Sequence, residues 1–286
     1  MFLKKLFAPF SARSELAADS GPDRVEAILA KMRAAARPCL RLAPADAGRS
    51  QLGGTPRMAA AWPRFEGRPM GLVAQLDLAE IQAAAGPDDF LGLPGAGRLL
   101  FFYDLELGGW GFDPKEAGSS VVIYEAGDAA LATEPDDLPA DARFDAYPVT
   151  FVADVSFPSE ERAEADLAGL SRREARALEA AVEAMQPGEP AHQVGGYAGP
   201  VQGDDMELQC QLVTNGLNTG SPEGYAGPRA AALRPGAADW RLLLQVDTDD
   251  GAGMMWGDTG RLYFWIREAD ARAGDFSRTW TILQCC

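Results

Sequence analysis

Residues 72–77 read Leu-Val-Ala-Gln-Leu-Asp, and residues 242–247 read Leu-Leu-Leu-Gln-Val-Asp. Both stretches are short and apolar, and both end in a glutamine, an apolar residue and an aspartate. A short apolar run bounded by polar and turn-forming residues is typical of a buried β-strand. Because the two stretches follow the same pattern position by position, we predict that the strands Gly71–Leu76 and Arg241–Val246 are equivalent in two related halves.

Two further landmarks accompany each of these strands in the same order. A glycine pair precedes them, at Gly53-Gly54 and at Gly195-Gly196, and a Gly-Arg pair with an apolar, aromatic run follows them, at Gly97 and at Gly260. The three landmarks are offset by 142, 170 and 163 residues between the copies. The same order with unequal offsets indicates a duplicated unit with different insertions. The alternative is coincidence, since apolar strands that end in Asp are common.

Six other segments are rich in β-branched or aromatic residues and bounded by Gly, Pro or Asp, which is typical of short strands. Few helices of crossover length separate them, so we expect mainly antiparallel pairing. Helices are expected over residues 23–36, over residues 78–84, and from the capping box that begins at Ser171. The six further predicted strands are Arg98–Tyr103, Ser120–Tyr124, Tyr147–Val152, Glu207–Val213, Arg261–Ile266 and Thr279–Gln284.

The predicted fold class is therefore α+β, with mainly antiparallel sheets from two pseudo-repeated halves and a few flanking helices. With 286 residues, 47% of them hydrophobic, the chain is long and apolar enough to bury a substantial core. We expect an N-terminal arm and helix over residues 1–37, a first pseudo-repeat over 38–157 and a second over 158–286. The two pseudo-repeats are expected to form one compact duplicated domain.

The chain is strongly acidic, with a formal net charge of −16. Such a surface repels phosphate backbones and anionic lipid headgroups, so we expect neither nucleic acid nor a membrane as partner. A partner selected by charge would be a basic protein. Half of the net charge lies in residues 134–166, a stretch read either as a solvated connection or as a docking face for a cationic protein.

The four cysteines show neither a CxxC spacing nor the pattern of a disulfide framework. Reduced thiols in a cytoplasmic protein are the simpler interpretation. The apolar run near the N-terminus is too short for a signal peptide, and no stretch reaches the length of a membrane span. We therefore expect a cytoplasmic protein.

Several segments between residue 38 and the C-terminus carry a family resemblance. They are Leu52 to Pro56, Trp62-Pro63, Pro69 to Asp77, Leu93 to Gly97 leading into Leu99 to Phe102, His192 to Gln202, Leu243 to Asp247, Trp256 to Phe264, and Asp275-Phe276. Together they resemble the YwqG-like proteins, a bacterial family of unknown function. The resemblance implies an α+β fold with duplicated halves, and it supplies no catalytic residues to carry over.

The equivalent strands place Gln75 beside Asp77 and Gln245 beside Asp247, because residues two apart in a strand share a face. One hypothesis is that these pairs line a cleft between the halves and bind a small polar ligand. The other is structural: Asp77 caps the helix over 78–84, Asp247 belongs to a tight turn, and the glutamines satisfy buried backbone groups. We favour the structural role and keep the four residues as candidates.

Three more residues complete the candidate ligand site. His192 is the only histidine, which excludes any site that needs two; it is expected to be structural, with a general base as the alternative. Trp256 lies in a loop next to a glycine, where an indole either lines a pocket or covers the core. Asp258 lies close to the Asp-rich turn of 247–251, but the ligand spacing of a calcium loop is missing.

No phosphate-binding, dinucleotide-binding or serine-hydrolase motif is present in the sequence, and we expect no catalytic residues, metal or cofactor. The favoured function is a non-catalytic binding or interaction protein, including an immunity-type acidic inhibitor of a basic toxin. The alternative is an enzyme or receptor that binds a small polar ligand between the halves. A third hypothesis is an accessory protein whose sheet edge receives another chain.

Overall fold

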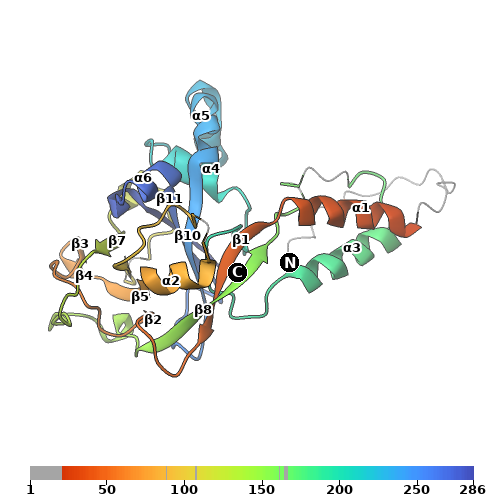
Figure 1. Ribbon diagram of the computed structural model, residues 1–286. Coiled ribbons are helices and arrows are strands. Elements are labelled where there is room, and N and C mark those ends of the chain that lie inside the picture. Colours follow the sequence, from red (N-terminus) through yellow and green to blue (C-terminus); the bar gives the residue numbers. More distant parts are fainter. Residues whose placement is uncertain (1–20, 88, 107, 161, 164–166) are drawn as a thin grey trace. The chain divides into compact units, whose positions relative to one another are not determined.

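The structure is a computed structural model that describes residues 21–87, 89–106, 108–160, 162–163 and 167–286 (Figure 1). Most of the expected N-terminal arm, residues 1–20, lies outside the described residues. The chain divides into two compact units. A helical unit contains the described parts of Met1–Arg37 and Ser156–Gly188, and a β-rich unit contains Pro38–Val155 and Glu189–Cys286.

Two helices make up the helical unit, α1 (Gly21–Ala34) and α3 (Arg172–Met185). Arg24 donates hydrogen bonds to the carbonyls of Ala168 and Gly169, so both helices begin at the same end of the unit. Their apolar faces form one cluster that includes Ile28 and Leu178. The predicted capping box of α3 is confirmed in both of its hydrogen bonds.

The β-rich unit contains one ten-stranded sheet. Its order from edge to edge is β12-β11-β10-β9-β1-β8-β2-β5-β6-β7, and every pairing with a defined register among the described residues is antiparallel. This confirms the α+β class and the antiparallel sheet. The strands are β1 (Arg37–Pro44), β2 (Gln51–Leu52), β5 (Gly71–Asp77), β6 (Arg98–Tyr103), β7 (Ser120–Glu125), β8 (Tyr147–Ser156), β9 (Gln193–Val194), β10 (Trp240–Asp247), β11 (Arg261–Arg267) and β12 (Trp280–Gln284).

The remaining described elements flank this sheet. A small hairpin is formed by β3 (Arg64–Phe65) and β4 (Arg68–Pro69). The further helices are α2 (Leu78–Ala85), α4 (Met206–Val213), α5 (Gly227–Leu233) and α6 (Glu268–Arg272), with short 3₁₀ turns that include η2 (Pro114–Glu116) and η6 (Phe276–Arg278). In the part of the chain that the structure describes, no helix combines the length and apolar composition that a membrane crossing requires.

The middle of the sheet is built by an exchange of strands. β1 precedes β2 in the chain but pairs with β9, and β8 precedes β9 but pairs with β2. Segments from early and late in the chain therefore alternate at the centre of the sheet, and neither can complete it alone.

The sheet curls around one large apolar cluster, and smaller clusters lie against other parts of it. Phe101 of β6 and Phe264 of β11 meet edge to face, with ring centroids 5.1 Å apart, although six strands lie between β6 and β11 in the sheet order. The two edge strands also come close to each other, because Tyr124 of β7 contacts Phe276 of η6 at a centroid distance of 5.8 Å. The sheet order nevertheless gives β7 and β12 no common pairing.

A loop covers part of the edge of β12 instead. The carbonyl of Trp110 accepts a hydrogen bond from the Leu283 amide at 3.2 Å, and the carbonyl of Gly111 accepts one from Trp280 Nε1 at 2.7 Å. Gly111 has φ of 84°, and a Cβ there would lie 2.2 Å from the Thr281 carbonyl oxygen. Only glycine permits so close an approach of the two backbones.

One predicted strand is wrong: Glu207–Val213 belongs to the helix α4. Leu208, Cys210 and Leu212 alternate with glutamines, which produced the period of a strand. In the structure Gln209 and Gln211 are buried as well, and Gln211 Oε1 accepts a hydrogen bond from Trp240 Nε1 at 3.1 Å. In a strand with one solvent-exposed face, the polar residues of an alternating pattern are exposed. Here the glutamines are buried along with the apolar residues, so the alternation does not indicate a strand. The strand β1 and the helix α5 were not predicted.

Candidate functional site

Gln75 is the first of the seven predicted site residues along the sequence. Its side chain is buried and joins two loop segments: Nε2 donates to the Arg49 carbonyl at 3.1 Å, and Oε1 accepts from the Arg57 amide at 2.8 Å. Asp77 caps α2 by accepting from the amides of Ala79 and Glu80. Both polar side chains are therefore engaged with the local backbone.

Gln245 makes the same pair of contacts on β10. Its Nε2 donates to the Ala191 carbonyl at 2.6 Å, and its Oε1 accepts from the Gly199 amide at 2.9 Å. Ala191 and Gly199 lie 142 residues after Arg49 and Arg57, the offset at which the two glycine pairs repeat. Each glutamine thus connects one backbone carbonyl and one backbone amide of the loops beside its strand.

Asp247 is buried, and its side chain accepts three hydrogen bonds. Its carboxylate accepts from the Ala191 amide at 2.7 Å, from the Thr248 amide at 3.0 Å, and from Nε of Arg261 at 2.8 Å. Trp256 is also buried, and its Nε1 donates to the Asp247 carbonyl at 3.1 Å. Asp258 is exposed.

His192 has both ring nitrogens occupied. Nδ1 lies 3.0 Å from the Asp247 amide nitrogen and can only accept there, so the proton sits on Nε2, which donates to Asp249 at 3.1 Å. Burial lowers the pKa of His192, and the nearby Asp249 carboxylate opposes that shift. The imidazole is therefore a neutral group that fixes the chain. Among the described residues, no three Asp, Glu, His or Cys side chains are arranged to hold a metal ion.

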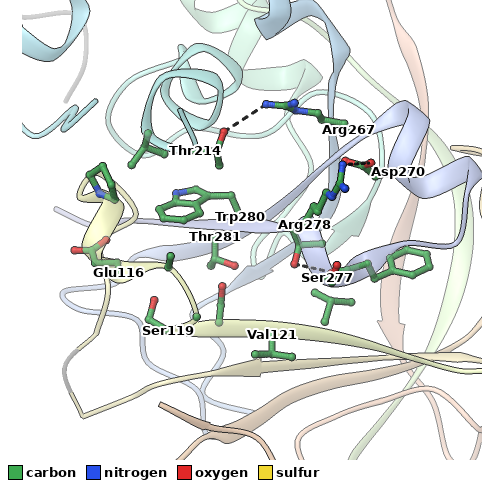
Figure 2. Close-up of a pocket in the computed structure, with 18 of the residues that line it drawn as sticks. Glu116, Ser119, Val121, Thr214, Arg267, Asp270, Ser277, Arg278, Trp280 and Thr281 are labelled. Carbon is green, nitrogen blue, oxygen red and sulfur yellow. Dashed lines mark hydrogen bonds and ion pairs between the residues drawn. The ribbon is translucent and has the colours of Figure 1, made fainter. Parts of the chain in front are cut away.

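The structure instead contains a cavity that the sequence did not indicate. It has a volume of about 660 Å³ and lies between the edge strands β7 and β12, next to the end of α4. Figure 2 shows Ser119 and Val121 on one side, with Trp280 and Thr281 facing them. None of the seven predicted site residues lines it. Its lining residues are Pro114, Glu116 to Val122, Val213 to Gly216, Trp240, Arg267, Asp270 and Phe276 to Thr281.

Charged groups in the wall of the cavity are matched by partners. Arg267 donates to Gln211 Oε1 at 2.9 Å and lies over the Trp240 ring, with 4.9 Å to the ring centroid. Arg278 forms an ion pair with Asp270 at 3.6 Å (Figure 2). Glu116 accepts from the Gly111 amide at 2.5 Å, and burial raises its pKa.

Thr281 is the exception among the polar residues of the wall. It is 5% exposed, and its hydroxyl has no hydrogen-bond partner among the described residues. A buried hydroxyl without a partner is unfavourable and marks a place where another group can add a hydrogen bond.

Sequence reasoning missed this cavity because its lining comes from four separate stretches of chain. Trp280 is a buried residue of a predicted strand, and no motif distinguishes the residues around Ser119 or Thr214. The available signal was the long connection between β6 and β7, whose glycines allow the loop to reach β12.

The first prediction concerns the glutamines. Replacing Gln245 by Met keeps the approximate side-chain volume but leaves a buried carbonyl and a buried amide without partners, so we expect the free energy of unfolding to fall by about 1–3 kcal/mol. Gln75→Met should behave alike. The control is Gln82→Met in α2, at a partly exposed position, which should cost little. Urea unfolding followed by tryptophan fluorescence measures all three; equal effects would contradict the structural role.

The second prediction follows from the lowered pKa of His192. Below about pH 6.5 the unfolded chain binds a proton on this imidazole more readily than the folded state does. The free energy of unfolding therefore decreases as the pH is lowered, by at most about 1.4 kcal/mol per pH unit from this group. His192→Asn keeps an acceptor for the Asp247 amide and should remove this slope between about pH 6.5 and 5. Unfolding curves across that range test it, and identical slopes in both proteins would refute it.

Comparison with known proteins places the chain in a family. Residues 50–285 match the model of a family described as a domain of unknown function (DUF1963). No curated protein matches the chain. The match spans most of the sequence, including every strand of the β-rich unit except β1, together with all residues that line the cavity. The chain therefore belongs to the DUF1963 family.

Proposed function

We propose that this chain is a non-catalytic binding protein whose ligand occupies the cavity between β7 and β12. The observation that carries the proposal is the cavity itself, whose volume of about 660 Å³ falls within the usual range of ligand sites. Its wall combines apolar surfaces from Trp240, Trp280 and Phe276 with a few polar groups, the composition expected of such sites.

The lining residues favour binding over catalysis. The only histidine of the chain lies elsewhere with both nitrogens engaged, so no imidazole can activate the serines of the wall. Glu116, whose pKa is raised by burial, is the group best suited to exchange a proton, but it is held by the Gly111 amide. An enzyme acting on a small polar ligand, the alternative function, would have to rely on Glu116.

A second candidate function is supported by the net charge of −16. A strongly acidic surface attracts a basic partner and speeds its association at low salt, which fits an immunity-type inhibitor of a basic toxin. A cytoplasmic location is part of this proposal, and the four cysteines, all of them free thiols, support it.

We also propose that the β-rich unit arose by duplication, as in the YwqG-like proteins that the sequence resembles. The paired contacts of Gln75 and Gln245 support it, and so do the irregularities in register after Leu72 and after Leu242. The sequence pattern predicts that the second copy starts at residue 158; we propose β8 instead, because β8 precedes β9 as β1 precedes β2. The first strand of each copy then pairs with a strand of the other copy.

The third prediction tests the cavity. Ser277 is exposed and lies on its wall, so Ser277→Trp fills the opening without disturbing the core. The matched control is Ala130→Trp, at an exposed position outside the cavity. Acetylated amino-acid amides and uncharged pentapeptides serve as probes in thermal unfolding. A ligand at a hundred times its Kd stabilises the folded state by about 2.7 kcal/mol.

We expect any probe that raises the Tm of the wild type to raise that of Ala130→Trp equally and to leave Ser277→Trp unchanged. A probe that stabilises both tryptophan variants to the same extent binds outside the cavity and would contradict the proposal.

A further inference from the structure

We infer that the ligand of this cavity is a short, extended, uncharged polypeptide segment of another protein, which pairs with the open edge of β7. This inference rests on the proposed function, because it assigns a ligand class to the same cavity. The third hypothesis from the sequence, a sheet edge that receives another chain, is thereby given a specific strand.

The first observation is the phase of the pairing between β6 and β7. The Asp104 amide donates to the Ser119 carbonyl at 2.8 Å, so this pair is hydrogen-bonded across the two strands. In an antiparallel ladder such pairs alternate. Val121 and Ile123 therefore bond to β6, whereas the amides and carbonyls of Ser120 and Val122 point away from it.

The second observation is that the cavity lies on this outward side. Ser119 to Val122 line it, and no residue of β6, the only neighbour of β7 in the sheet, does so. No hydrogen bond from another described residue uses the outward backbone groups of Ser120 and Val122. An added strand lies about 4.8 Å from its neighbour and advances about 3.3 Å per residue, so roughly three residues suffice to follow the lined part of β7.

At the opposite edge of the sheet, some of the outward backbone groups of β12 are hydrogen-bonded to a loop. On β12 the loop around Gly111 covers the edge, and the Trp110 carbonyl accepts from the Leu283 amide. The described part of the chain supplies no equivalent cover to the outward groups of Ser120 and Val122. An unpaired strand edge beside a preformed cavity is the arrangement that strand addition by an extended peptide requires.

The chemistry of the wall defines the segment. Arg278 pairs with Asp270, whereas Arg267 and Glu116 hydrogen-bond to neutral groups, the Gln211 side chain and the Gly111 amide. The two basic and two acidic residues of the wall sum to zero formal charge, so no excess charge of either sign selects a charged ligand. The indole of Trp280 and the Thr281 hydroxyl instead favour apolar and small polar side chains.

The experiment uses the full-length protein and the pentapeptide acetyl-Thr-Val-Thr-Val-Thr-amide in isothermal titration. Ser120→Pro removes one outward amide at the first position of β7, where proline does not break the ladder to β6, and Ser120→Ala is its matched control. Two peptide analogues, N-methylated on both valines or on all threonines, remove the amides of one side each. Acetyl-Val-amide tests a ligand too small to pair along the strand.

We expect the pentapeptide to bind the wild type and Ser120→Ala alike, and to bind Ser120→Pro at least about tenfold more weakly. At least one N-methylated analogue should lose affinity to a similar extent. Circular dichroism checks that Ser120→Pro is folded; should it not fold, the N-methylated series alone decides the question.

Equal affinity for Ser120→Pro and Ser120→Ala, or for all three peptides, would overturn strand pairing, as would the absence of binding at millimolar peptide. If acetyl-Val-amide binds as tightly as the pentapeptide and Ser277→Trp abolishes both, the cavity is a small-ligand site: the proposed function stands and this inference fails. If binding survives in Ser277→Trp, the proposed function fails as well.

Discussion

The constraint on which this structure depends is that a ten-stranded sheet encloses one core while its two edges remain unpaired. Phe101 and Phe264 face each other inside it, and β7 and β12 approach without forming a ladder. The loop around Gly111 satisfies part of β12 and leaves β7 open. The cavity is the space that results, so the fold leaves this cavity where its own strand pairing stops.

The exchange of β1 and β8 joins the earlier and later segments of the chain into one unit. Each of these strands pairs with the segment that follows the other, so separating the segments would expose unpaired backbone at the middle of the sheet. The polar residues near the ends of β5 and β10 also hold this unit together. Gln75, Gln245 and His192 connect the strands to the loops beside them, and ligand chemistry is not required to explain their burial.

Local patterns were sufficient for much of the fold. The capping box at Ser171, the helix after Asp77 and seven of the eight predicted strands could be read from the sequence, because short-range periodicity and caps determine them. The helix α4 could not, since its glutamines are buried by partners distant in sequence. The cavity could not either. Its size and position depend on how strongly the whole sheet curves around the core, and no single segment of the sequence determines that curvature.

The most direct measurement of the central claim is amide hydrogen exchange along β7 in the free protein. Val121 and Ile123 bond to β6, whereas the amides of Ser120 and Val122 face the cavity. The account predicts alternating protection, with Ser120 and Val122 exchanging roughly a hundredfold faster than Val121 and Ile123. Uniform protection of all four amides would show that the edge of β7 is already paired, and would contradict the account.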